Sequence, residues 1–242
     1  MTNKVDAVVR AGRVVTASGV VEADVAVTDG RITEIGPRLE VEAGEEIDAS
    51  GLHVFPGGVD AHVHFNEPGR AEWETIACGS AALAAGGYTS YVDMPLNSLP
   101  VTIDIDAFDL KLAAASMTAI VDFGIWGGLS GCQSTRRLLL ARSLDLRRLA
   151  AATAGNVARR FALAGKGEIA PGYDADLWLV DLTDTDVLRR EELLYKNRFS
   201  AHEGQPVRGR TVRTIRRGET VFAGGKAVVE SGGRFMRPAG ER

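Results

Sequence analysis

The sequence predicts an α/β protein, a partial eightfold β/α barrel with β-structure at both chain ends. Three observations predict it: strands and helices alternate in the middle of the chain, turn-rich β-segments flank that middle, and the middle is short. Alternating strands and helices imply parallel βαβ units, whose sheet has to be covered on both faces. The span from Val54 to Gly165 gives room for about half of a barrel that typically takes about 250 residues.

The elements of the middle follow one another in a regular order until the alternation stops. The predicted strands are 54–64, 88–94 and 119–126, and the predicted helices between them are 72–85 and 104–115. Gly86 and Gly87 end the first helix, as C-terminal glycines commonly do. Beyond residue 126 the pattern predicts two helices, 135–144 and 146–163, with no strand between them.

Both chain ends alternate and turn like β-structure. Asp29-Gly30 separates two apolar runs and is a strong hairpin signal. Near the other end, residues 176–180 form a predicted buried strand, and Arg217-Gly218-Glu219 separates two further runs. The two ends are therefore expected to be β-rich.

Composition excludes several classes of function. The chain has 242 residues, 45% hydrophobic and 25% charged, with a net charge of −4, so no basic surface argues for nucleic acid. No apolar run approaches the roughly 20 residues of a membrane span. Two cysteines imply no disulfide framework. The first residues lack the apolar core of a signal peptide, so a cytoplasmic location is expected.

The first predicted strand of the middle ends in His62-Val63-His64. Residues two apart in a strand share a face, so the two imidazoles converge, and neutral imidazole suits zinc and similar metals. An isolated His-x-His is more often just two polar residues on a half-exposed strand. Asp60 on the same strand face, the glycines at 57 and 58, and the polar loop that follows favour a metal site at a barrel strand's C-terminal end.

Residues 52–70 resemble the first barrel strand of the cyclic amidohydrolases, in the amidohydrolase superfamily. The family pattern is Gly-x-x-Asp-x-His-x-His followed by Glu-Pro-Gly, and all of it stands here. Dihydroorotases usually carry Arg where Asn66 stands, to hold a substrate carboxylate, so Asn66 favours the allantoinases within the group. The further segments that resemble allantoinases are 66–70, 72–74, 93–98, 130–135, 153–158 and 167–176.

The resemblance implies a fold and a set of roles. The expected fold is the partial barrel over 52–169, with a junction near 129–130, plus a small β-sandwich made of 1–51 and 170–242. A family-like homo-oligomer is also implied. The expected cofactor is zinc, as a bridged pair in the family, and the expected substrate is a small cyclic ureide, allantoin, opened to allantoate. The implied metal ligands are His62 and His64, the substrate contacts are Asn66, Arg70 and Asn97, and the supporting residues are Asp60 and Glu67.

Much of the family's two-metal site has no counterpart in this chain. The family also uses a carboxylated Lys, two further His and a catalytic Asp from later strands. The other two histidines, His53 and His202, match no family ligand, and no Lys lies between Lys111 and Lys166. We therefore expect this chain to be inactive or impaired, with at most a partial, weak zinc site.

The sequence at the junction suggests how the chain arose. Residues 126–129 resemble a Trp-Gly-Gly-apolar tetrapeptide that tends to occur at two places in allantoinases, which suggests an in-frame deletion between short repeats. A half-barrel is expected to leave its first and third strands as open edges.

Two alternative functions stay open. One is that of another cyclic amidohydrolase, a dihydroorotase or hydantoinase, and the other is that of a non-catalytic pseudoenzyme or partner subunit.

Overall fold

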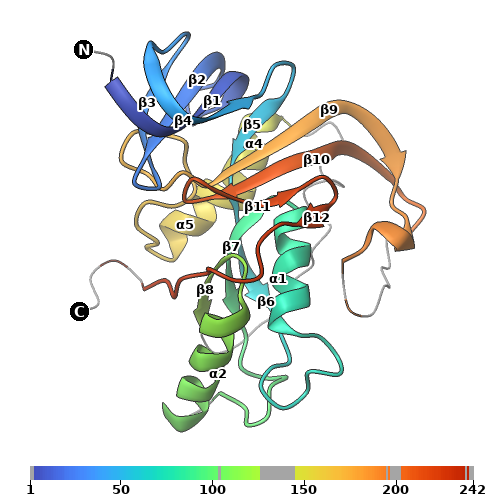
Figure 1. Cartoon of the computed structure of the whole chain (residues 1–242). Helices are drawn as coiled ribbons and strands as arrows, with labels where there is room; N and C mark the ends of the chain where they lie inside the picture. Colours follow the sequence, from blue (N-terminus) through green and yellow to red (C-terminus); the bar gives the residue numbers. More distant parts are fainter. Residues whose placement is uncertain are drawn as a thin grey trace.

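The computed structural model describes residues 3–102, 105–125, 145–194, 196, 203–237 and 239. The predicted helix 135–144, the last residue of the predicted strand 119–126, the junction near 129–130 and His202 lie outside these residues. In the described part of the chain, the strands form two sheets, one of nine strands and one of three (Figure 1).

Strands from both chain ends form the larger sheet. Its order is β12-β11-β10-β9-β5-β1-β2-β3, with β4 paired beside β1. The strands are β1 (Asn3–Val15), β2 (Val20–Thr28), β3 (Arg31–Gly36), β4 (Val41–Asp48), β5 (His53–Pro56), β9 (Leu177–Val187), β10 (Pro206–Arg216), β11 (Glu219–Ala223) and β12 (Lys226–Ala227). The two β-rich ends are thus joined where β5 pairs with β9, and the two-layered sandwich stays a prediction.

The middle of the chain forms the parallel sheet β6-β7-β8. Its elements are β6 (Gly58–Val63), α1 (Ile76–Ala85), β7 (Tyr88–Asp93), α2 (Ile105–Thr118) and β8 (Asp122–Ile125). Both strand pairs are parallel, as two successive βαβ units require. In the apolar core that also contains the inner face of α1, Phe65 meets Tyr91 edge to face and Tyr91 stacks on Phe123.

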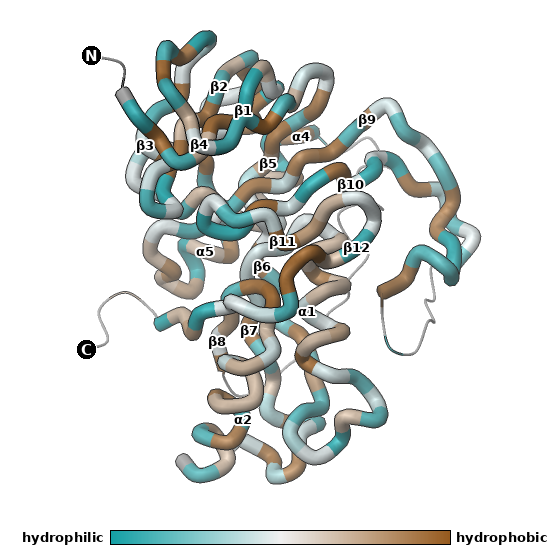
Figure 2. Tube along the Cα trace, viewed as in Figure 1, coloured by the Kyte–Doolittle hydropathy of each residue, from teal (hydrophilic) through white to brown (hydrophobic). Residues whose placement is uncertain are grey.

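The predicted first strand, 54–64, is in fact two strands in different sheets. The chain changes sheet at Gly57, where a Cβ would lie 2.2 Å from the hydroxyl oxygen of Thr89. The Gly57 amide donates to the carbonyl of Asp176, and the Gly58 amide donates to that of Gly87. A glycine is needed because the backbone passes so close to β7. Figure 2 shows the apolar stretches of β5 and β9 meeting in the larger sheet.

Two predicted helices have different limits in the structure. Helix α1 begins at Ile76 rather than at residue 72, because Thr75 is its N-cap and accepts a hydrogen bond from the Cys78 amide at 3.0 Å. The predicted helix 146–163 consists of α4 (Leu146–Ala150), the π-helix η1 (Ala151–Gly155) and α5 (Asn156–Arg160). A 3₁₀ turn, η2 (Arg190–Glu192), follows β9.

Neither outer strand of the small sheet is bare. On the side away from β7, β8 forms backbone hydrogen bonds with residues 234–236 near the C-terminus. The prediction that the third strand has an open edge is therefore wrong for the described residues. The outer side of β6 has no strand partner among these residues, but Val59 packs against Ala158 and Leu163 of the following helical segment. Residues 158–163 therefore pack against part of that strand.

None of the helices in the described part of the chain is long and apolar enough to cross a membrane.

Candidate functional site

His62 and His64 lie together at the C-terminal end of β6. Their ring centroids are 5.5 Å apart, and the rings are tilted by 56°. Nε2 of His62 and Nδ1 of His64 are buried and have no hydrogen-bond partner. Burial lowers the pKa of both imidazoles; the neighbouring His64 adds to this effect for His62, and Lys111 adds to it for His64. Two neutral imidazoles with unused ring nitrogens are the donors that zinc prefers.

Asp60 supports this pair through the backbone. Its Oδ1 accepts a hydrogen bond from the His62 amide at 3.0 Å. Burial raises the pKa of Asp60 to about 7, and the His62 amide opposes the rise. Asp60 thus holds the main chain of the motif in place.

The loop after β6 carries three more of the predicted residues. Asn66 is buried, and its Oδ1 has no hydrogen-bond partner. Glu67 accepts from the Ile76 amide at 2.8 Å and so satisfies one of the free amides at the start of α1. The guanidinium of Arg70 lies 5.1 Å from the ring centroid of Trp73, which is exposed.

Asn97 lies in the loop after β7, which contacts the loop after β6. The Met94 amide donates to the Val63 carbonyl at 2.9 Å, and the Leu99 amide donates to the Pro68 carbonyl at 2.7 Å. Asn97 itself is half-buried. The structure therefore brings the predicted metal, substrate and supporting residues to one end of the small sheet, on two connected loops.

Sequence reasoning missed the side chain that ties these loops together. Lys111 of α2 is fully buried, and its Nζ lies 2.9 Å from Asp93 Oδ2. The same ammonium donates to the carbonyls of Phe65 and Met94, both at 3.2 Å, and Asp93 Oδ1 accepts from the Phe65 amide. Lys111 shares the helical spacing of Phe108, Leu112 and Ala115, and a lysine on an apolar helix face is the pattern that could have identified it.

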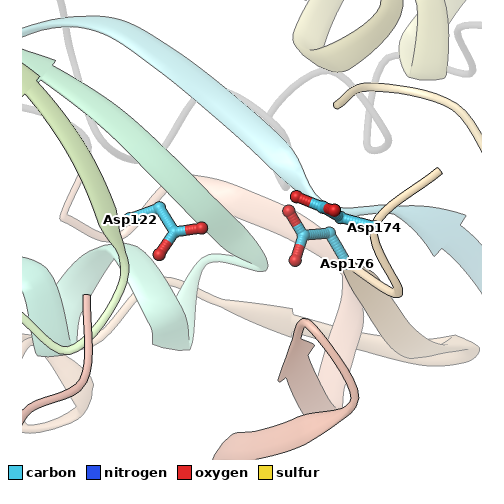
Figure 3. Close-up of side chains that lie close together, drawn as sticks. All are labelled: Asp122, Asp174 and Asp176. Atoms are coloured by element: carbon cyan, nitrogen blue, oxygen red, sulfur yellow. The ribbon is translucent and has the colours of Figure 1, made fainter. Parts of the chain in front are cut away.

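A cluster of three carboxylates elsewhere in the fold is not a metal site. Asp122 of β8 faces Asp174 and Asp176, which precede β9 (Figure 3). The ammonium of Lys166 lies among them, at 2.6, 3.1 and 2.7 Å respectively. Burial opposes this charge, but the surrounding carboxylates outweigh burial and raise the Lys166 pKa. The cluster is an ion network that joins β8 to the larger sheet.

The donors around the histidines fit only part of a zinc centre. In the described residues, no group of three ligand side chains within mutual reach includes His62 or His64. Catalytic zinc normally has three protein ligands and an open position. Two imidazoles can hold the ion weakly, and the remaining ligands expected from the family are not supplied by the residues described.

Comparisons with known proteins identify the family to which this chain belongs. A sequence model of the amidohydrolase family matches residues 53–144. An allantoinase of Rubrobacter xylanophilus is 30% identical over 448 positions, covering 98% of both chains. An allantoinase of Solibacter usitatus is 60% identical over 124 residues, which is 51% of this chain and 27% of that enzyme. The chain belongs to the amidohydrolase family, and its resemblance to allantoinases is confirmed.

Solved structures show the same fold. An L-hydantoinase from Arthrobacter aurescens superposes with a TM-score of 0.88 at 18% identity, covering 96% of this chain and 99% of that chain. A D-hydantoinase superposes with a TM-score of 0.85 at 16% identity, covering 99% of both chains.

The alignment with the Rubrobacter allantoinase shows where that enzyme is longer than this chain. The alignment with the Rubrobacter enzyme has 448 positions and this chain has 242 residues, so at least 206 positions of the alignment have no residue from this chain. The alignment nevertheless covers 98% of each partner. The relative therefore has a long internal block that this chain does not match.

Proposed function

We propose that this chain is an allantoinase-type amidohydrolase by descent, which binds zinc weakly through His62 and His64 and is inactive or impaired as a hydrolase on its own. The observation that carries the proposal is the pair of buried imidazole nitrogens without partners at the end of β6. They are unused donors within the fold, and the buried Oδ1 of Asn66, two residues after His64, has no hydrogen-bond partner either. The bridged pair of ions in the family would need ligands beyond these two.

Different residues of the chain would bind zinc, position the zinc ligands and bind the substrate. His62 and His64, held neutral by burial, present lone pairs to an ion. Asp60 and Lys111 fix the main chain on either side of the pair. Zinc, when bound at such a site, lowers the pKa of a coordinated water toward about 7 and polarises a carbonyl. Asn66, Arg70 and Asn97 would bind and orient the ring of the substrate.

The proposed substrate is a cyclic ureide, allantoin, whose ring amide opens to allantoate. The supporting residue is Asn66, since its neutral amide suits a ring without a carboxylate, whereas a carboxylate substrate calls for a cation. The names of the relatives support the same choice. The alternative is another cyclic amidohydrolase, a dihydroorotase or hydantoinase. The solved hydantoinase structures do not favour it, because at 18% identity and below they inform on the fold alone.

A direct test measures zinc binding by equilibrium dialysis followed by metal analysis. We expect weak binding that H62A and H64A each abolish, while H53A retains it because His53 lies on β5 in the other sheet. Two tightly bound zinc ions per chain would contradict the proposal. So would allantoin hydrolysis, with zinc added, near the rate of an intact family enzyme.

The non-catalytic alternative has its own readout. If the chain acts as a partner subunit, it should co-purify with a full-length relative from cells that express both. The proposal further includes a cytoplasmic location and a homo-oligomer.

Sequencing the locus from fresh DNA tests the proposed in-frame deletion near residues 129–130, because an intact interior block in frame would refute it.

A further inference from the structure

The outer edge of β8 is paired with an extended segment from the C-terminal end of the chain. We call residues 233–237 the C-terminal segment. The Phe123 amide donates to the Arg234 carbonyl at 2.9 Å, and the Met236 amide donates to the Phe123 carbonyl at 2.6 Å. These two bonds surround the bridge between Phe123 and Phe235, which is parallel. The C-terminal segment thus pairs in parallel with the outer edge of β8 through one isolated bridge.

Side chains hold the C-terminal segment against the small sheet. The ring of Phe235 lies 5.9 Å from that of Phe123 on β8 and 5.9 Å from that of Phe108 on α2. Met236 packs in the cluster that contains Val59 of β6. The segment therefore contacts β8 and α2, and it packs against the apolar cluster that also contains Val59.

Backbone bonds anchor the stretch at both of its ends. At the start of the C-terminal segment, the Gly233 amide donates to the Ala119 carbonyl at 2.8 Å. Beyond it, the Ala239 amide donates to the Ala162 carbonyl, just after α5, at 2.7 Å. Figure 1 shows this red trace leaving β12 and running past β8 and below α5. The chain end thus spans the side of the sheet where a barrel would continue.

We propose that the outer edge of β8 is a strand-docking edge, which the chain's own C-terminal segment fills as a surrogate for a fourth barrel strand. A second copy of the chain is the partner that this edge would otherwise accept. An unpaired edge presents free amides and carbonyls to any other extended chain. Each copy carries the same edge, so loss of the internal contact leaves the β8 edges of two copies free to pair with each other. This inference does not depend on the metal site.

Gly233 gives a precise way to disturb the docking. A Cβ at this position would lie 2.1 Å from the carbonyl oxygen of Val121 and 3.0 Å from the Cβ of Ala119. Neither atom belongs to a flexible side-chain end, so Gly233→Ala forces the C-terminal segment away from the strand. Gly19 is the matched control, because a Cβ there meets nothing within 4 Å and its φ is not in the left-handed region.

The experiment combines hydrogen exchange with light scattering on the full chain. We expect G233A to lose protection of the Phe123 amide at low protein concentration. At higher concentration, we expect its mass to increase relative to the wild-type chain. G19A should behave as wild type. A chain ending at Ser231 should show the same changes, and a synthetic peptide of residues 229–239 should reverse its gain in mass.

Each other outcome counts against the inference. A Phe123 amide that stays protected in G233A, with an unchanged mass, would mean that the C-terminal segment does not guard this edge. A gain in mass that the peptide fails to reverse would place the association elsewhere. If the shortened chain does not fold, as judged by circular dichroism, the exchange and mass of G233A decide the question.

Discussion

Replacing Lys111 by Met removes a buried cation on which two loops depend. The ammonium is 0% exposed and lies 2.9 Å from the carboxylate of Asp93, which is 3% exposed. It also bonds the carbonyls of Phe65 and Met94. Met fills a similar volume without the charge, so Asp93 is left as a buried carboxylate with no cation. Breaking a buried pair in this way typically costs about 3–5 kcal/mol.

The cost of this substitution should depend on pH in a defined direction. Burial raises the pKa of Asp93 from 3.8 to about 6, and Lys111 opposes the rise. A carboxyl whose pKa is higher in the folded state makes its contribution to stability below its unfolded pKa and loses it as pH rises through the folded one. Without Lys111, the folded pKa of Asp93 rises further. We expect the loss of stability in K111M to be largest near pH 8 and smaller near pH 5, where Asp93 becomes protonated.

Urea unfolding at pH 5 and pH 8 measures this effect. The surface control is K4M, because Lys4 is 78% exposed and its pair with Glu42 should contribute at most about 1 kcal/mol. The double variant K111M/D93N should recover part of the lost stability at pH 8, since no buried charge remains. A loss below about 1 kcal/mol at pH 8, or a loss equal at both pH values, would refute this reasoning.

Three further substitutions test other parts of the fold by the same urea measurement. G87A places a Cβ 2.3 Å from the ring of Trp178 and should cost about 1–3 kcal/mol more than G51A, which has the same positive φ but open space; equal costs would contradict the clash. T75A removes the N-cap of α1 and should cost about 1 kcal/mol; no loss would mean that the cap adds nothing. K166M leaves three carboxylates without their shared ammonium and should cost about 3–5 kcal/mol; a near-neutral result would refute the importance of that network.

Periodic patterns predicted the elements of the small sheet well. The alternation of strands and helices located β6, α1, β7, α2 and β8, because each depends on local apolar spacing. The end of the first strand was predicted to hold His62 and His64 on one face, and the structure brings their rings to 5.5 Å. These features could be derived because the residues that produce them are close in sequence.

The features that sequence reasoning missed depend on residues far apart in the chain. The break at Gly57 follows from the closeness of Thr89, which lies on β7. The pairing of β8 with Phe235 joins positions more than a hundred residues apart. No periodic pattern encodes such contacts, because they are set by packing after the elements have formed.

The contacts around the histidines explain how part of a larger site can persist. In the described residues, the side chains that hold the motif are Asp60, Glu67, Asp93 and Lys111, and all of them come from β6, β7, α2 and the loops between them. Their bonds close within two βαβ units and need nothing from later strands. The proposed zinc ligands would therefore keep their local geometry even where ligands from other strands are not supplied. These two units also hold the His-x-His motif, the strongest part of the resemblance to the family, so the motif depends on contacts that the described residues supply among themselves.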